Sequence, residues 1–199
     1  MNLLSYFLLA KSAYTIPPDI GKESTSARAI KNTTEEGLVI SFPGSNNIAC
    51  WLADLDIETI KVWSLGELHK GFWESLREIE TELLELKPVA TCGHSEGAAL
   101  AILYGAVLCL NQTPPKVIYA FESPRVTTDG VLKELFSEYG VKLVLTQNGN
   151  DVVPMVPRLI HNWQHPGPLM DIGIASEPFP NVEDHLLKNV EVSVRNICL

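Results

Sequence analysis

The sequence predicts an α/β fold with a mostly parallel central sheet covered by helices on both faces. Short apolar segments alternate with segments of helical periodicity over most of the 199 residues, an order typical of strands connected by helices. No repeat, low-complexity tract or linker divides the chain. Because 46% of the residues are hydrophobic and 20% are charged, we expect residues 1–199 to form a single globular domain.

The first half is expected to contain a strand hairpin and a long helix. Ala27–Lys31 and Gly37–Phe42 have the apolar pattern of strands, and residues 32–36 form a polar turn between them. Lys70–Leu86 carries apolar side chains at helical spacing with acidic residues between them. Lys87-Pro88 ends that pattern, as proline does beyond a helix.

The second half continues the alternation. Val89–Cys92 is a short apolar strand. Ala98–Leu110 is apolar on nearly all sides, which predicts a buried helix. The later expected elements are a strand at Lys116–Phe121, a helix at Gly130–Tyr139, a strand at Val141–Gln147 and a final element at Leu186–Val194.

Charge and cysteine content limit the partners. The formal net charge is −9, from 24 acidic and 15 basic residues, so nucleic acid is not an expected partner. Cys50, Cys92, Cys109 and Cys198 form no CxxC pair and have no histidine at metal-ligand spacing, so we expect no metal. Cys92 and Cys109 lie in apolar segments, where a thiol behaves as a small hydrophobe, and this favours a reducing compartment.

The apolar start of the chain has two possible interpretations. Met1–Ala10 is apolar enough for a signal peptide, but no Lys or Arg precedes the run and its apolar core is short. The alternative is an amphipathic helix over Leu3–Tyr14 that packs on the domain. Elsewhere no stretch approaches the roughly 18 consecutive apolar residues of a spanning helix. Together with the cysteines, this favours a cytoplasmic location over secretion.

Gly93-His94-Ser95-Glu96-Gly97 has the GxSxG pattern of a nucleophile elbow. A serine on a tight turn between strand and helix has strained backbone angles, so the flanking positions must lack bulk. The turn also places the first helical N–H groups beside the hydroxyl, where they can stabilise an oxyanion. An apolar strand precedes the motif and a buried helix follows it, as the elbow requires, so Ser95 is the candidate nucleophile.

A serine hydroxyl needs a base to accept its proton, and the base needs an acid to hold its tautomer. In this type of fold the acid follows a late strand, and Asp151 does so, in a Gly/Asn turn after Val141–Gln147. The alternative is that Asp151 only caps that turn. Asp129, which precedes a helix as an N-cap does, and Asp171, in a strand-like segment without turn residues, are rivals.

His185 is the candidate base, because it follows a proline-rich loop and opens the last element. His161 and His165 lie nearer Asp151 and could instead be surface or hydrogen-bonded structural residues. His94, inside the elbow, points away from Ser95 by strand alternation and is expected to be structural. His69 precedes the acid in the chain and is expected to be a packed polar residue.

Several further motifs extend along nearly the whole chain. They are Phe42-Pro43-Gly44-Ser45, Trp51-Leu52-Ala53-Asp54-Leu55, His69-Lys70-Gly71-Phe72, Gly93–Ala99, Phe121–Val126, Asn150–Pro154 and Asp184-His185-Leu186. In this order they resemble the motifs of the class 3 lipase family, the fungal-lipase-like branch of the α/β-hydrolase superfamily. The resemblance implies the α/β-hydrolase fold and independently points to Ser95, Asp151 and His185 as a catalytic triad.

The resemblance also implies roles that the residues alone do not. Ser45 and the backbone N–H of Glu96 would be the oxyanion donors. Asn46–Asp54 would form a lid whose Ile48, Trp51 and Leu52 cover the site in water and turn toward lipid. The alternative for these apolar side chains is ordinary packing onto the core. No cofactor is implied.

The implied activity is hydrolysis of carboxylic esters, of the lipase or acylglycerol kind, with a small-molecule or lipid ester as substrate at a lipid–water interface. A small-ester esterase, a phospholipase, a hydrolase of thioesters or amides and a non-catalytic lipid-binding descendant are the alternatives. Pro43 stands in place of the family's usual Arg, Glu96 in place of Leu and Glu122 in place of Gly, and the chain is shorter than typical secreted members. A Glu96 carboxylate near the pocket would disfavour anionic substrates.

Overall fold

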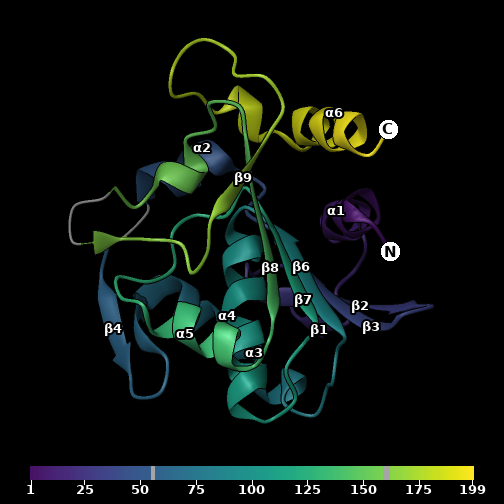
Figure 1. Ribbon diagram of the computed structural model, residues 1–199, viewed down its shortest axis with the longest axis vertical. Coiled ribbons are helices and arrows are strands. Elements are labelled where there is room, and N and C mark those ends of the chain that lie inside the picture. Colours follow the sequence, from purple (N-terminus) through teal and green to yellow (C-terminus); the bar gives the residue numbers. More distant parts are fainter. Residues whose placement is uncertain (55–56, 159–161) are drawn as a thin grey trace.

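The computed structural model describes residues 1–54, 57–158 and 162–199, and Figure 1 shows a twisted central sheet with helices on both faces. Within these residues the main sheet has the strand order β1 (Ile20–Gly21), β2 (Arg28–Thr34), β3 (Gly37–Phe42), β6 (Ala90–His94), β7 (Val117–Phe121), β8 (Lys142–Asn148) and β9 (Leu169–Ile172). β1, β2 and β3 pair antiparallel, whereas β3, β6, β7, β8 and β9 pair parallel. The predicted fold class is confirmed.

One face of the sheet is covered by α3 (Lys70–Leu83), α4 (Glu96–Leu110) and α5 (Val131–Glu138) (Figure 1). Residues Glu96–Cys109 of α4 are all buried, because the sheet lies on one side of this helix and α3 and α5 lie beside it. The segment is apolar on nearly all sides because the helix is buried on all sides, as the sequence predicts.

The other face carries α1 (Leu3–Ser12) and α6 (Leu187–Ile197), which contact each other (Figure 1). Tyr6 of α1 stacks on Tyr119 of β7 at 4.1 Å between ring centroids, and Phe7 packs edge-on against Phe121 at 5.1 Å. The apolar N-terminal run thus forms a helix that ends at Ser12, two residues before the expected end at Tyr14, and its aromatic side chains fill this half of the core.

The strand register brings the carboxyl ends of the parallel strands to one level. Phe42 of β3 lies beside Gly93 of β6, His94 lies beside Phe121 of β7, and Phe121 lies beside Thr146 of β8. The segments that leave these ends begin with Pro43, Ser95, Glu122 and Gly149. In open α/β sheets this edge is where functional side chains gather.

Several features differ from the prediction. β4 (Thr59–Val62) and β5 (Gly66–His69) form a separate antiparallel pair, and β1 extends the main sheet at one edge. β2 continues to Thr34, so the polar turn expected over residues 32–36 is shorter. β9, at the other edge, is the strand-like segment that holds Asp171. The helix expected over Lys70–Leu86 ends at Leu83.

α2 (Ile48–Asp54) is the short helix that the family resemblance implies. Among the described residues, no helix is both long and apolar enough to cross a membrane.

Candidate active site

Ser95 lies on a sharp turn between β6 and α4, and its backbone has φ 60° and ψ −131°. This is the strained conformation that an elbow serine adopts. A Cβ on Gly93 would lie 2.2 Å from Gly97 O, and a Cβ on Gly97 would lie 2.2 Å from Phe42 O. Both neighbours are backbone atoms that cannot move aside, so the two glycines are required by the close approach of strand, turn and helix.

The side chains of Asp151 and His185 meet although 34 positions separate them in the chain. His185 Nδ1 lies 2.7 Å from Asp151 Oδ2, and both side chains are almost fully buried, at 3% and 0% exposure. The other carboxylate oxygen, Asp151 Oδ1, accepts a hydrogen bond of 2.9 Å from Val153 N–H. Since Nδ1 faces a carboxylate, it carries the proton, and Nε2 is left with a free lone pair.

The third link, from Ser95 to His185, is not formed as a hydrogen bond. Ser95 Oγ and His185 Nε2 are both buried and have no hydrogen-bond partner among the described residues. His94 nevertheless brings the two segments together, because it directly precedes Ser95 in the chain and its ring centroid lies 4.5 Å from that of His185. Catalytic hydrogen bonds in free enzymes are often long and tighten only when substrate binds.

His94 connects the N-terminal segment to the segment that carries His185. Its Nε2 lies 3.0 Å from His185 O and its Nδ1 lies 2.8 Å from Tyr14 Oη. Burial, and then the neighbouring His185 ring, hold the pKa of His94 well below its ordinary value. The neutral ring therefore donates from Nε2 to the His185 carbonyl and accepts from Tyr14 at Nδ1. His94 therefore has the structural role expected from the sequence.

The acid turn and the segment before His185 are bound together by Asp184. Its Oδ2 accepts a 2.8 Å hydrogen bond from Asn150 N–H and a 3.0 Å hydrogen bond from Asn181 Nδ2. Its Oδ1 accepts a 2.6 Å hydrogen bond from Ser176 Oγ. Asp184 thus holds the chain on either side of the contact between Asp151 and His185.

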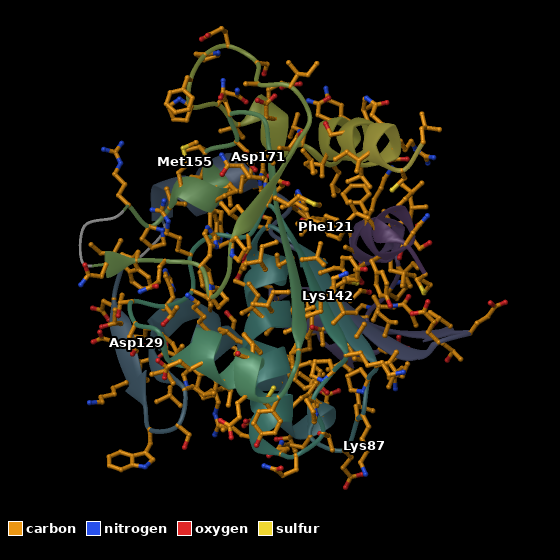
Figure 2. All side chains as sticks on the ribbon, in the orientation of Figure 1. Lys87, Phe121, Asp129, Lys142, Met155 and Asp171 are labelled. Atoms are coloured by element: carbon orange, nitrogen blue, oxygen red, sulfur yellow. The ribbon has the colours of Figure 1, made fainter. Side chains whose placement is uncertain are left out.

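The rival residues lie apart from this contact. Figure 2 shows Asp129 beside β4, on the side of the molecule away from α6, and its Oδ1 accepts a 3.1 Å hydrogen bond from Val131 N–H, at the start of α5. Asp171 is exposed on β9. His165 Nε2 lies 2.9 Å from Pro154 O, and burial lowers the pKa of His165 to about 4. His161 lies outside the described residues.

His69 is a packed polar side chain, as expected. It is 2% exposed and stacks on Phe72 with 3.9 Å between ring centroids. Its Nδ1 accepts a 3.4 Å hydrogen bond from Phe72 N–H, which caps the start of α3.

The expected oxyanion donors lie at the two sides of the elbow. A Cβ on Gly44 would lie 2.8 Å from Ser95 Cβ, so the end of β3 approaches the nucleophile closely, and Ser45 is the next residue. Ser45 is half-buried and its Oγ accepts a 3.3 Å hydrogen bond from Asn47 N–H. Glu96 is the first residue of α4, where a backbone N–H is free to donate.

A pocket of about 440 Å³ opens beside the elbow. Its lining includes Ser45, Trp51, Phe72 and Glu96. Trp51 of α2 stacks on Phe72, with ring centroids 6.1 Å apart and an angle of 9° between the planes. The expected lid is therefore a helix with its tryptophan packed over this pocket.

The other expected lid side chains, Ile48 and Leu52, are half-buried. Ile48 lines a smaller pocket of about 180 Å³ beside His94 and His185. Leu55, in the motif that suggested the lid, lies outside the described residues, as do the side chains of Ala49, Ala53 and Asp54.

Glu96 is buried in the wall of the larger pocket, at 6% exposure. Burial raises the pKa of the Glu96 carboxyl, while a hydrogen bond from Ser26, the charge of Arg28 and a hydrogen bond from Trp51 act against that rise. The pocket therefore has an acidic group in its wall, close to the helix of the expected lid.

The fold and this cluster define the class. A mostly parallel sheet, a strained serine between strand and helix, and a histidine–aspartate pair beside it are the features of the α/β-hydrolase fold. Residues 39–161, more than half of the chain, match the family lipase (class 3). The chain belongs to the class 3 lipase family.

Known relatives agree with this assignment. A lipase of Rhizomucor miehei is 28% identical over 159 residues, which are 72% of this chain and 44% of the relative. The secreted mono- and diacylglycerol lipase A of Penicillium cyclopium is 31% identical over 147 residues, which are 68% of this chain and 48% of the relative. The chain therefore spans about half the length of these relatives. The structure of Rhizomucor miehei triacylglyceride lipase superposes with a TM-score of 0.74 at 22% identity, covering 92% of this chain and 91% of that one.

The expected cytoplasmic location is wrong. The Penicillium relative is named a secreted lipase, which points to secretion. The cysteine argument fails for a physical reason: Cys92 and Cys109 are buried free thiols, and a buried thiol that reaches no partner carries no information about the redox state outside.

Proposed function

We propose that this chain is a serine ester hydrolase of the lipase type, with Ser95 as nucleophile, His185 as general base and Asp151 as the acid that orients it. The proposal is carried by the buried 2.7 Å contact between His185 Nδ1 and Asp151 Oδ2, next to the strained turn of Ser95. A neutral imidazole held in this way by a buried carboxylate keeps Nε2 available as a base.

The proposed reaction passes through an acyl-enzyme. Ser95 Oγ attacks the ester carbonyl carbon while His185 Nε2 accepts the hydroxyl proton, and Asp151 stabilises the imidazolium that forms. The tetrahedral intermediate then collapses, and His185 returns the proton to the leaving alcohol. Water, activated by the same histidine, attacks the acyl group and releases the acid.

The negative oxygen of each tetrahedral intermediate needs donors fixed in advance. We assign this role to Ser45, at the end of β3, and to the backbone N–H of Glu96 at the start of α4. Support comes from the close approach of β3 to the elbow, since a Cβ on Gly44 would touch Ser95 Cβ at 2.8 Å. The positive end of the α4 dipole favours the same charge.

The proposed substrates are neutral acylglycerols. The named relatives act on mono- and diacylglycerols or on triacylglycerides, and a Glu96 carboxylate in the pocket wall disfavours an anionic head group. In the same proposal α2 is a lid, and Ile48, Trp51 and Leu52 are its lipid-facing side chains. Trp51 would leave Phe72 when the site opens toward a lipid surface.

Labelling with an alkyl fluorophosphonate tests the nucleophile. We expect wild type to be labelled on Ser95 and S95A to remain unlabelled. S137A removes an exposed serine of α5 and should react like wild type. Equal labelling of S95A would show that another residue is the nucleophile, and failure of wild type to react would favour a lipid-binding protein; either result would overturn the proposal.

Turnover assays test the substrate class. We expect faster hydrolysis of emulsified diacylglycerol than of phosphatidylglycerol with the same acyl chains, and a weaker preference in E96Q. Faster cleavage of soluble short-chain esters than of any emulsion would instead indicate an esterase. Preference for the anionic phospholipid would indicate a phospholipase.

A further inference from the structure

A second carboxyl group lies behind the acid of the proposed triad. Glu122 directly follows β7, at the same sheet edge as Ser95 and Asp151. Its φ is +52°, a left-handed conformation that favours glycine, and its side chain is 0% exposed. The family motif carries glycine at this position, so this chain places a buried acid in a strained conformation where the smallest residue would suffice.

The contacts of Glu122 connect it to the acid turn. Its Oε1 accepts a 2.9 Å hydrogen bond from Thr146 Oγ1, and its Oε2 accepts a 2.7 Å hydrogen bond from Asn148 N–H. Both donors belong to β8, the strand that leads to Asp151. Asn148 also accepts a 3.0 Å hydrogen bond from Asp151 N–H, and the Asp151 charge acts on the Glu122 carboxyl.

A further hydrogen bond links this group to the segment of the proposed base. Asn148, which donates its N–H to Glu122, donates its side-chain Nδ2 to Asp184 O at 2.7 Å. Asp184 directly precedes His185. Glu122 therefore binds the strand that leads to the acid of the proposed triad and lies two hydrogen bonds away from the backbone beside the base.

Two adjacent carboxyls in a buried site cannot both be ionised at moderate cost. Burial, and then the charge of Asp151, raise the pKa of Glu122 well above its ordinary value, while the Asn148 and Thr146 donors oppose this. Asp151 faces His185 Nδ1 and Val153 N–H, which both favour the carboxylate. The proton of the pair therefore belongs to Glu122.

We propose that Glu122, as a neutral acid, is a positioning residue for the triad: its O–H hydrogen-bonds the Asp151 carboxylate and aims that charge at His185 Nδ1. This inference rests on the proposed function. Among the described residues, the ionisable side chains around the pair are His185 against Asp151, His94 beside the His185 ring, and Asp184 across Asn148. Within the pair, the Glu122 proton offsets the negative charge of Asp151.

The test is the pH dependence of kcat/KM for wild type, E122Q and E122A, with E134Q, at an exposed position of α5, as the matched control. Wild type should lose activity at alkaline pH as Glu122 ionises and its donor is lost. In E122Q the amide oxygen accepts from Asn148 while the NH₂ group donates at every pH, so its alkaline decline should disappear. E122A should lose about tenfold or more at all pH values, because Asp151 is no longer held. E134Q should follow wild type.

The outcomes separate the two proposals. A wild-type enzyme that reacts with fluorophosphonate and turns over, but whose alkaline decline persists unchanged in E122Q, overturns the role of Glu122 alone. A wild-type protein that neither reacts nor turns over overturns both proposals. If E122A does not fold, the E122Q profile decides, since glutamine has nearly the same shape as glutamate.

Discussion

The elbow and the acid–histidine cluster of this molecule are built by different means. Backbone packing builds the elbow: β6, the Ser95 turn and α4 are consecutive in the chain, and Gly93 and Gly97 allow them to touch. Side-chain hydrogen bonds build the cluster, and they join β7, the turn after β8 and the segment of His185 through Glu122, Asp151 and Asp184. The elbow should therefore fail through steric clash, and the cluster through lost hydrogen bonds or misplaced charge.

The largest effect should come from Asp151 in the cluster. D151N keeps the shape of the side chain but favours the wrong tautomer of His185, so kcat should fall about 10⁴-fold while the fold persists. D171N, a change of an exposed aspartate on β9, is the control and should leave kcat unchanged. A D151N enzyme within tenfold of wild type would show that Asp151 only caps its turn.

The next effect should come from the elbow, and it should appear in stability. In G97A the new Cβ would lie 2.2 Å from Phe42 O, so β3 and α4 must separate, at a cost of about 3 kcal/mol in the free energy of unfolding. G130A has no atom closer than 4.0 Å to its Cβ and serves as control. Urea unfolding measures both, and equal stability of G97A and wild type would contradict the packing described for the elbow.

These two regions also differ in how far the sequence reveals them. GxSxG is a local pattern, and the flanking strand and helix follow from apolarity alone, so β6, α4 and the other central elements could be predicted. β1, β4 and β5 have only two to four residues each, and runs this short do not show a hydrophobic period that identifies a strand.

The cluster was only partly predictable. Asp151 and His185 could be chosen from chain order, and the structure brings these two side chains together. Glu122 was visible only as a departure from the family pattern, because its meaning depends on contact with Asp151, 29 residues later in the sequence. Tyr14 had no signal at all, since its link to His94 spans 80 positions.

A smaller effect is expected from Asp184. D184A removes the acceptor for Asn150 N–H and Ser176 Oγ, and the loss of these charge-assisted hydrogen bonds should cost about 2 kcal/mol in the free energy of unfolding. E183A, at an exposed neighbouring position, is the control, because its ion pair with Lys188 is exposed. Urea denaturation of the two variants should differ, and equal stability would show that Asp184 does not hold the loops.

The Asp184 carboxyl should also make the free energy of unfolding depend on pH in the acid range. Burial alone would raise the pKa of Asp184, but hydrogen bonds from Ser176, Asn150 and Asn181 outweigh it and lower that pKa. Its contribution to stability is therefore present above the ordinary aspartate pKa of 3.8 and is lost as pH falls through the lowered folded-state value. The gap between wild type and D184A should narrow in that acid range.

The smallest effect is expected from Glu122, and its dependence on pH is opposite to that of Asp184. Its pKa is raised in the folded protein, so its stabilising contribution is fully present below the ordinary glutamate pKa of 4.5 and is lost as pH rises through the folded-state value. E122Q does not titrate, so its Tm should exceed that of wild type by a few degrees at alkaline pH and by less in acid. Parallel Tm curves for the two proteins would contradict a buried, proton-holding Glu122.

The most direct measurement of the triad is a crystal structure of the protein after reaction with an alkyl phosphonate. We expect phosphorus bonded to Ser95 Oγ, His185 Nε2 within about 2.6–3.2 Å of Ser95 Oγ or the phosphonyl oxygen, and Asp151 still bonded to His185 Nδ1. An adduct on another residue, or a Ser95 adduct with the His185 ring turned away and out of reach, would contradict a triad of Ser95, His185 and Asp151.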